Sequence, residues 1–462
     1  MSNPGTNEHF DVVIVGARCA GSPLAILLKR AGLSVCVVDQ AGFPSDALST
    51  HMFQISGIEV MQKLGIFDDV LATNAPPVTT CHMRFEDVDF SGPPRVREGD
   101  PPVPMLCVRR ISLDVILVEK ARAEGVDVRL HTRVTGLVEK DGRVAGIRVA
   151  ARDGHASTIS AGLVVGADGR LSTIARLVGA RRYHVLPSER LSTWAYFSGV
   201  PREPEARLFY FRQGDEFIVA SPTDNDLFLA ISCPSVEQSP AYRADGEGAF
   251  NRAVATCEPL ADLLSGAKRE TKFRGLTRFE GYFREAAGPG WVLVGDSGHF
   301  KEPTPGQGIS DALRQVDKLS AAIVRGFAAR GRLDAELRGW WRWRDRDSIQ
   351  HYWFCFDVGR RGPISPVRLE ILRAVAANDE WRMDFLDIFM HRKYPRQVLR
   401  PTTLAAATAR ALANPAKRPG ALRDAYALAR EDVSRRFQAW FPRLNEKAAV
   451  DEPHLDHQPS AA

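Results

Sequence analysis

A turn near the start of the sequence carries the residue types that hold a dinucleotide. Gly16 and Gly21 bound the segment Gly-Ala-Arg-Cys-Ala-Gly, which lies between an apolar run at 11–15 and a helix-like segment at 22–30. The free N–H groups and the positive dipole end of such a helix attract a pyrophosphate. Asp39 ends the next apolar run, 18 residues after Gly21, where an acid accepts hydrogen bonds from a ribose diol. The segment therefore predicts a βαβ unit that binds a dinucleotide.

The middle glycine of the usual G-x-G-x-x-G pattern is replaced by Arg18. A glycine at this position lets the backbone approach the phosphates. Either the loop lies farther out, or the Arg18 side chain folds away or pairs with a phosphate. Asp39 argues against NADP, which carries a 2′-phosphate, but it does not separate NAD from FAD.

Two later segments repeat the arrangement of an apolar run that ends near a glycine and an acid. The first is followed by Asp168-Gly169. The second is followed by Gly295-Asp296, then by a loop rich in Pro and Gly, and then by a helix expected at about 309–325. Two further strand ends of this kind predict that one ligand contacts several turns at one edge of a parallel sheet.

These three segments together resemble the flavoprotein monooxygenase family related to para-hydroxybenzoate hydroxylase. That family has an N-terminal glycine fingerprint, a D-G pair in mid-chain, and a G-D pair followed by H-x-x-x-P-x-x-G-Q-G. The sequence G-D-S-G-H-F-K-E-P-T-P-G-Q-G reproduces the last of these without insertion. The resemblance covers roughly 8–185 and 285–330 and implies that FAD is the cofactor.

The resemblance also implies roles for individual residues. Asp296 would contact the ribityl chain or a nearby phosphate, and Val134 would lie beside adenine. Arg110, with Arg109 as the alternative, would reach the phosphates or ribityl chain. Backbone N–H groups of the loop before the helix would face the N1–C2=O edge of the flavin, where negative charge collects on reduction. The expected cofactor-binding residues are Gly16, Ala17, Cys19, Ala20, Gly21, Asp39, Gln40, Arg109, Arg110, Val134, Asp168, Gly169, Gly295, Asp296, Pro303, Gly306, Gln307 and Gly308.

No side chain is assigned as a certain catalytic residue, because the flavin would carry the chemistry. His299 is a candidate acid or base, although the equivalent residue in the family mostly supports its loop. Lys301 lies either near the flavin or in solvent. His51 either lines the substrate side or lies on the surface. Cys19 is expected to be a packing residue and not a point of flavin attachment.

The predicted fold class is α/β, with a Rossmann-like FAD-binding domain of the glutathione-reductase type, a mixed β-sheet substrate domain and a helical C-terminal region. The FAD-binding domain is assembled from 8–75, 105–180 and 285–330. The insertions 76–104 and 181–284 form the sheet, 331–445 is helical, and 446–462 is a disordered tail. In the sheet, the candidates to line an apolar substrate pocket are Phe209, Phe211, Phe217 and Phe228, of which about half should face the flavin.

Composition sets further bounds. The chain of 462 residues has a formal net charge of only +5, which does not support nucleic-acid binding. Its seven cysteines are scattered without metal-binding spacing, so neither a metal site nor a disulfide framework is expected and a reducing cytoplasm fits best. No signal-peptide core and no apolar run of about 18 residues is present, so no transmembrane segment is expected.

We therefore expect a cytoplasmic FAD-dependent monooxygenase, a monomer or homodimer, that oxygenates an aromatic or apolar small molecule with O₂. NAD(P)H would reduce the flavin transiently, or a separate flavin reductase would supply electrons, because the sequence holds only one dinucleotide fingerprint. A reductase of double bonds resembling geranylgeranyl reductase and a non-catalytic flavin- or lipid-binding protein are the alternatives. A halogenase is rejected, because the W-x-W sequence at 341–343 lies outside the FAD-binding segments and lacks the following I-P.

Overall fold

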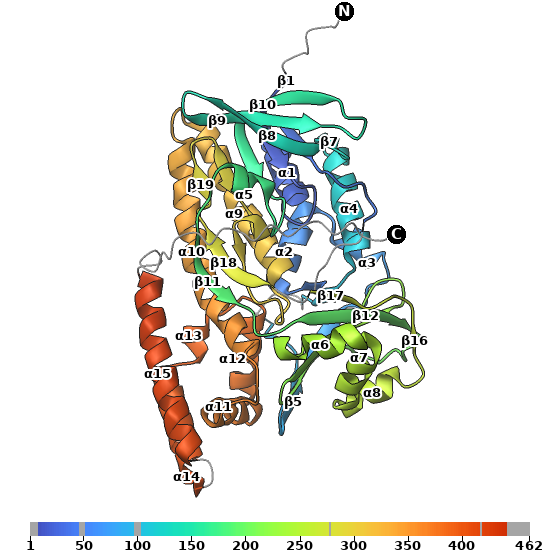
Figure 1. Ribbon diagram of the computed structural model, residues 1–462, viewed down its shortest axis with the longest axis vertical. Helices are drawn as coiled ribbons and strands as arrows, with labels where there is room; N and C mark the ends of the chain where they lie inside the picture. The colour runs from blue at the N-terminus through green and yellow to red at the C-terminus, as the bar shows by residue number, and fades with distance from the viewer. Residues whose placement is uncertain (1–7, 46–50, 97–102, 277–278, 416–417, 441–462) are drawn as a thin grey trace, which may run out of the picture.

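A computed structural model describes residues 8–45, 51–96, 103–276, 279–415 and 418–440 (Figure 1). The expected tail at 446–462 lies outside the described residues. Among the helices of the described ranges, none is long and apolar enough to cross a membrane.

The first sheet is the expected Rossmann-like sheet. Its core runs in the order β20-β10-β1-β2-β7, and every neighbouring pair in this core is parallel. The strands of the sheet are β1 (Glu8–Val15), β2 (Val35–Val38), β7 (Asp127–Arg129), β8 (Arg133–Lys140), β9 (Arg143–Ala150), β10 (Ala156–Gly166), β19 (Ala287–Gly288) and β20 (Trp291–Leu293).

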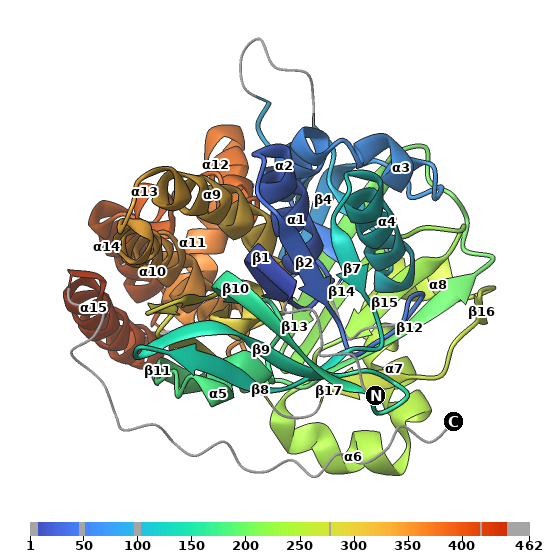
Figure 2. The same ribbon diagram turned by 90° about the horizontal axis from the view of Figure 1, so that it is seen from above.

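Both faces of this sheet are buried, which explains the continuous apolar run of its first strand. Val12 and Ile14 of β1 pack with the helices, whereas Val13 and Val15 pack under the antiparallel pair β8–β9. Figure 2 shows helices α1 (Gly21–Arg30) and α4 (Arg110–Ala123) on one side of the sheet and β8 and β9 on the other. Strands buried on both faces have no need of polar alternation.

The second sheet is mixed, as expected for the substrate region. Its order is β16-β12-β15-β14-β13-β4-β5, with β17 beside β12, and only the β13–β4 pair is parallel. Its strands are β4 (Val78–Phe85), β5 (Val88–Gly92), β12 (Ser192–Ser198), β13 (Ala206–Gln213), β14 (Glu216–Pro222), β15 (Phe228–Ser232), β16 (Lys268–Arg269) and β17 (Arg274–Leu276). Smaller sheets are formed by β3 (Met52–Phe53) with β6 (Leu106–Cys107), and by β11 (Arg182–Pro187), β18 (Glu280–Arg284) and β21 (His299–Phe300).

Helices pack on both faces of the mixed sheet, and neither set of helices was predicted to pack there. Helices α7 (Gly246–Ala255) and α8 (Glu258–Leu264), inserted after β15, pack on the outer face. Helices α10 (Leu333–Val358), α11 (Pro366–Ala376) and α12 (Asp379–Phe389) of the C-terminal region pack on much of the inner face. The remaining helices are α2 (Ile55–Leu64), α3 (Phe67–Leu71), α5 (Thr173–Leu177), α6 (Ser239–Ala244), α9 (Gly308–Ala328), α13 (Pro395–Val398), α14 (Pro401–Ala413) and α15 (Arg418–Trp440).

Candidate functional site

The three glycine-bearing turns meet at one edge of the parallel sheet. Val15 at the end of β1 lies opposite both Val38 of β2 and Gly166 of β10, and Gly166 lies opposite Leu293 of β20. The strands therefore end in register. The residues that follow them, far apart in sequence, are brought side by side at the carboxyl edge, where ligands bind in open α/β sheets.

Close approach of these turns requires glycine. Gly16 has a φ of +105°, and a Cβ there would lie 2.4 Å from the carbonyl oxygen of Ala167. A Cβ on Gly21 would lie 1.7 Å from the carbonyl oxygen of Gly16. The first helix thus packs directly against the turn that precedes it, and the turn packs against the loop after β10.

A cavity of about 580 Å³ extends along this edge. This volume lies in the range of sites for small molecules and cofactors. Among the described residues, the predicted cofactor-binding residues that line the cavity are Gly16, Cys19, Ala20, Asp39, Gln40, Arg110, Val134, Asp168, Gly169, Gly295, Asp296, Pro303 and Gly308.

Two helix N-termini face the cavity without side-chain caps. Ala20 precedes α1 and Gln307 precedes α9, and neither side chain accepts a hydrogen bond from its helix. Residues at both starts line the cavity. Uncapped N–H groups at a helix start attract anions and carbonyl oxygens, so both helix starts fit the polar parts of an adenine-linked flavin.

Two carboxylates are held in place by the turns. One oxygen of Asp39 accepts from Ala17 N and the other from Ala41 N, each at 2.8 Å. Asp168 accepts from Ser172 Oγ at 2.5 Å and from the backbone N–H of Ile174 at 3.1 Å. Asp39 keeps free lone pairs for a ligand, whereas Asp168 mainly fixes the turn before α5.

Arg110 and Arg109, the two candidates to reach the phosphates or the ribityl chain, have different partners. Arg110 lines the cavity and makes two hydrogen bonds of 2.9 Å to Asp114. Arg109 instead pairs with Asp224, away from the cavity. Arg18, which replaces the middle glycine, also lines the cavity and bonds to Asp114 at 2.9 Å and to Ser45 at 2.7 Å, so both alternatives for its side chain stay open.

Cys19 is buried, and Asp296 is partly buried in the cavity wall. Burial raises the pKa of the Cys19 thiol to about 12, so it is a poor nucleophile at neutral pH. Burial raises the pKa of Asp296 to about 6, although the positive charges of Arg110 and Arg170 oppose this shift.

Lys301 is buried and not solvated. Its ammonium lies 2.6 Å from an Asp311 oxygen and donates to Gln307 Oε1 at 2.7 Å. Burial by itself would raise the pKa of Asp311, but the Lys301 ammonium holds it below its ordinary value. The other Asp311 oxygen lies 2.9 Å from His391 Nδ1.

His299 also lines the cavity. Its ring packs on Phe283 with the ring centroids 4.4 Å apart. Burial lowers the pKa of His299 well below its ordinary value, so the imidazole is neutral at neutral pH.

Five predicted cofactor-binding residues do not line the cavity. Ala17 donates its N–H to Asp39, and Gly21 packs against Gly16. The Gln307 side chain turns inward and donates to the carbonyl oxygens of Ile388 and Phe389. The five are Ala17, Gly21, Arg109, Gly306 and Gln307.

His51 is fully buried, so a surface position for it is wrong. It forms a hydrogen bond with the hydroxyl of Tyr196, which lies on β12. Burial lowers the pKa of His51 to about 3. His51 therefore joins the turn region to the mixed sheet, outside the residues that line the cavity.

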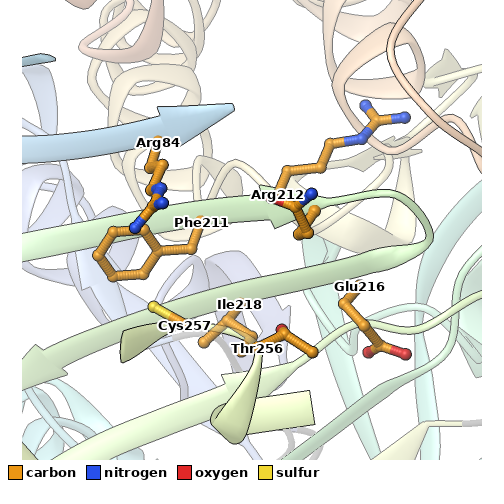
Figure 3. A pocket seen from close by; sticks show the side chains of 8 residues that line it. Arg84, Phe211, Arg212, Glu216, Ile218, Thr256 and Cys257 are labelled. Carbon is orange, nitrogen blue, oxygen red and sulfur yellow. The ribbon is translucent and has the colours of Figure 1, made fainter. Parts of the chain in front are cut away.

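None of the four predicted substrate phenylalanines lines the cavity. Phe209, Phe211 and Phe228 face the outer side of the sheet, where they pack with α7 and α8. Figure 3 shows Phe211 beside Arg84 and Cys257, around a hollow of about 10 Å³ that holds roughly one water. Phe217 faces the inner side but packs against Tyr210, which also contacts Phe389 of α12.

The residues of the mixed sheet that do line the cavity were not predicted. They are Ser192 and Trp194 of β12 and Ile231 of β15. Trp194 and Ile231 are directly opposite each other in the β12–β15 ladder. The apolar and aromatic run at 192–198 was a local signal for this strand, but the candidates chosen for the pocket were phenylalanines of other strands.

A model of one known protein family matches most of this chain. The family is described as "FAD binding domain" and matches residues 9–336. All the elements that line the cavity lie within this range.

Individual relatives differ in what their names describe. A 6-methylpretetramide 4-monooxygenase of Streptomyces rimosus is 28% identical over 71% of this chain and 78% of its own length. A digeranylgeranylglycerophospholipid reductase of Methanothermobacter thermautotrophicus is 28% identical over 73% of this chain and 84% of its own length. The solved structure of a flavin-dependent brominase has a TM-score of 0.70 at 20% identity and covers 87% of this chain and 98% of that one, a likeness of fold alone.

Proposed function

Because the chain belongs to the FAD-binding domain family, we propose that it is an FAD-dependent monooxygenase that transfers an oxygen atom from O₂ to a small organic substrate. The observation that carries this proposal is the cavity of about 580 Å³ in which all three glycine-bearing turns meet. The resemblance of those turns to the para-hydroxybenzoate hydroxylase family and the likeness to a monooxygenase of Streptomyces rimosus support it.

We propose that FAD lies along the cavity with its adenosine end at β1 and β2. The uncapped start of α1 would hold the pyrophosphate, and Asp39 would accept hydrogen bonds from the ribose hydroxyls. Val134 would lie beside adenine, Arg110 would face the phosphates or the ribityl chain, and Asp296 would accept from a ribityl hydroxyl.

The flavin end would lie against the start of α9. Reduced FAD supplies the activation of O₂, and the residues of this chain supply position and charge. Backbone N–H groups at the uncapped start of α9, where Gly308 lines the cavity, and the dipole of α9 would stabilise negative charge at the N1–C2=O edge. Lys301 would hold the loop in shape through Asp311 and Gln307.

The substrate side would be formed by the inner face of the mixed sheet. Trp194 and Ile231 present apolar surface to the cavity beside the neutral His299. This surface favours an apolar or aromatic substrate, which displaces water when it packs there.

Further parts of the proposal concern the whole protein. Electrons would come from NAD(P)H bound transiently or from a separate flavin reductase. The protein would work in the cytoplasm, where its seven buried thiols stay reduced, as a monomer or homodimer. The FAD-binding domain would comprise 8–75, 105–180 and 285–330, the substrate domain 76–104 and 181–284, and the helical region 331–445.

Labelled oxygen tests this function against the reductase alternative, which the likeness to a digeranylgeranylglycerophospholipid reductase supports. The FAD-loaded protein should consume NAD(P)H faster with a substrate, and the product should contain one ¹⁸O atom from ¹⁸O₂. A hydrogenated product formed without oxygen would favour the reductase. A flavin that stays oxidised both with NAD(P)H alone and with NAD(P)H plus a separate flavin reductase would favour a binding protein without catalysis.

Asp39→Ala should weaken FAD binding by about 1–3 kcal/mol, or roughly 5- to 150-fold, because it leaves buried ribose hydroxyls without an acceptor. The measurement is a titration of the flavin-free protein with FAD, followed by flavin fluorescence. Asp127→Ala at the start of the neighbouring strand β7, where the carboxylate pairs with Arg129 and does not line the cavity, is the control. Equal affinity of Asp39→Ala and the unaltered protein would show that Asp39 does not contact the ribose.

A further inference from the structure

Helix α15 presents an apolar stripe to solvent. Nine large apolar side chains are exposed among the described residues, and five of them lie on this one helix. Their exposed fractions run from 55% to 77%. We call these five residues the α15 stripe: Leu422, Tyr426, Val433, Phe437 and Trp440.

The spacing of the α15 stripe places it on a single side of the helix. Steps of 4, 7, 4 and 3 residues between its members keep all five within about 60° of the helix circumference. Scattered exposed apolar residues are ordinary on a protein surface, but a continuous apolar strip with three aromatic rings indicates an interaction site.

The α15 stripe is not the side by which the helix packs on the protein. The packing side carries Ala421, which is fully buried with Val367 of α11. It also carries Asp424, which accepts from the Val367 N–H at 2.9 Å, and Glu431, which pairs with Arg360 at 3.0 Å. Both views place α15 at the outer edge of the molecule (Figures 1 and 2). The stripe therefore faces outward while the opposite side is already occupied.

Arginines flank the α15 stripe on both sides. Arg423 and Arg430 lie about 80–100° from Leu422 in one direction, and Arg418 and Arg436 about 40° in the other. All four are exposed. Of the acids on this helix, Asp424 and Glu431 bond toward the protein, and Asp432 pairs with Arg436. The outward side of the helix is therefore apolar in the middle and mainly basic at its margins.

We propose that the α15 stripe docks on the surface of an anionic lipid bilayer, with the helix lying flat in the interface. Apolar side chains would enter the boundary of the acyl chains, the tyrosine and tryptophan would sit at headgroup depth, and the arginines would contact lipid phosphates. Charge complementarity selects this partner over a second copy of the chain, because two such faces would bring arginines against arginines.

Vesicle flotation with the full-length, FAD-loaded protein tests this docking. The protein should float with vesicles of equal parts phosphatidylglycerol and phosphatidylcholine, and at least about tenfold less with phosphatidylcholine alone or in 0.5 M NaCl. Absence of flotation with the anionic vesicles would overturn the proposal, and so would equal flotation with both kinds of vesicle.

Two double variants separate the apolar and the basic parts of the surface. Val433→Glu with Phe437→Glu should lower partitioning by at least about tenfold, and Arg423→Glu with Arg430→Glu should do the same. The control Arg330→Glu with Arg338→Glu makes the same change of net charge on exposed arginines outside α15 and should bind like the unaltered protein. All variants should keep their full flavin absorbance, because none of the substituted residues lines the cavity.

Sedimentation of the same proteins without vesicles tests whether a second copy of the chain, and not a lipid surface, covers the α15 stripe. A monomer that stays monomeric at all concentrations, or a dimer unaffected by the stripe variant, agrees with docking on lipid. A dimer that dissociates in Val433→Glu with Phe437→Glu would show that a second copy covers the stripe and would overturn the proposal.

Discussion

Asp296→Ala should purify largely without the yellow colour of bound flavin. The carboxylate of Asp296 follows β20, is partly buried, and lines the cavity where all three turns meet. Its removal would leave a ribityl hydroxyl without an acceptor at the middle of the cofactor, at a cost of about 1–3 kcal/mol for that hydrogen bond. The measurement is the ratio of flavin to protein absorbance after purification, with the affinity of the flavin-free protein for FAD as a second value.

The control for this prediction is Asp69→Ala, which removes an exposed carboxylate on α3 and should leave the protein yellow. Full flavin occupancy in Asp296→Ala would contradict the proposed position of the ribityl chain. It would leave the assignment of FAD itself intact, because that rests on the whole family match.

The raised pKa of Asp296 makes the stability of the flavin-free protein depend on pH. Because burial raises this pKa from 3.8 to about 6, the folded flavin-free protein holds a proton there that the unfolded chain releases. The stability contribution is therefore present at low pH and is lost as the pH rises through about 6. Asparagine has no carboxyl proton to lose, so Asp296→Asn should not lose stability in this way. The melting temperature of Asp296→Asn minus that of the unaltered flavin-free protein should therefore increase from pH 4 to pH 7. A difference that stays constant with pH would contradict the shift.

Lys301→Met should destabilise the protein by about 3–5 kcal/mol, because it leaves the Asp311 carboxylate buried without its cation. Methionine keeps most of the length of the lysine side chain, so lost packing contributes little. The measurement is the free energy of unfolding in urea, carried out on flavin-free protein so that cofactor loss does not enter.

The double variant Lys301→Met with Asp311→Asn separates charge from packing. An asparagine at 311 removes the uncompensated charge but still offers an oxygen to His391, so most of the lost stability should return. A single variant within about 1 kcal/mol of the unaltered protein, or a double variant no better than the single one, would show that the pair does not hold the loop before α9.

Which side chains face the cavity could not be predicted from the sequence, because it depends on the direction in which each side chain points in the folded protein. The insertion at 181–284 was expected to form strands, and β13, β14 and β15 lie within it, because strand composition and turns are local features. Which of their faces turns to the cavity depends on partners far away in sequence. Three of the four chosen phenylalanines face α7 and α8, and helices α10 to α12 fill much of the other face. The same dependence separates Arg110, which faces the cavity, from Arg109, which pairs with Asp224.

The sequence by itself determined the strand–turn–helix units that bind a dinucleotide, and the resemblance of its motifs to a known family pointed to FAD. Each unit needs only a few consecutive residues: an apolar strand, a glycine with the right backbone freedom, and a helix start. Only the tertiary structure decided that β1, β10 and β20 end in register, so that these units form one cavity. It also decided that Lys301 is buried against Asp311, that Trp194 faces the cavity, and that α15 keeps an apolar stripe outside. Burial and ion pairing arise from contacts between segments distant in the chain, and no local pattern specifies them.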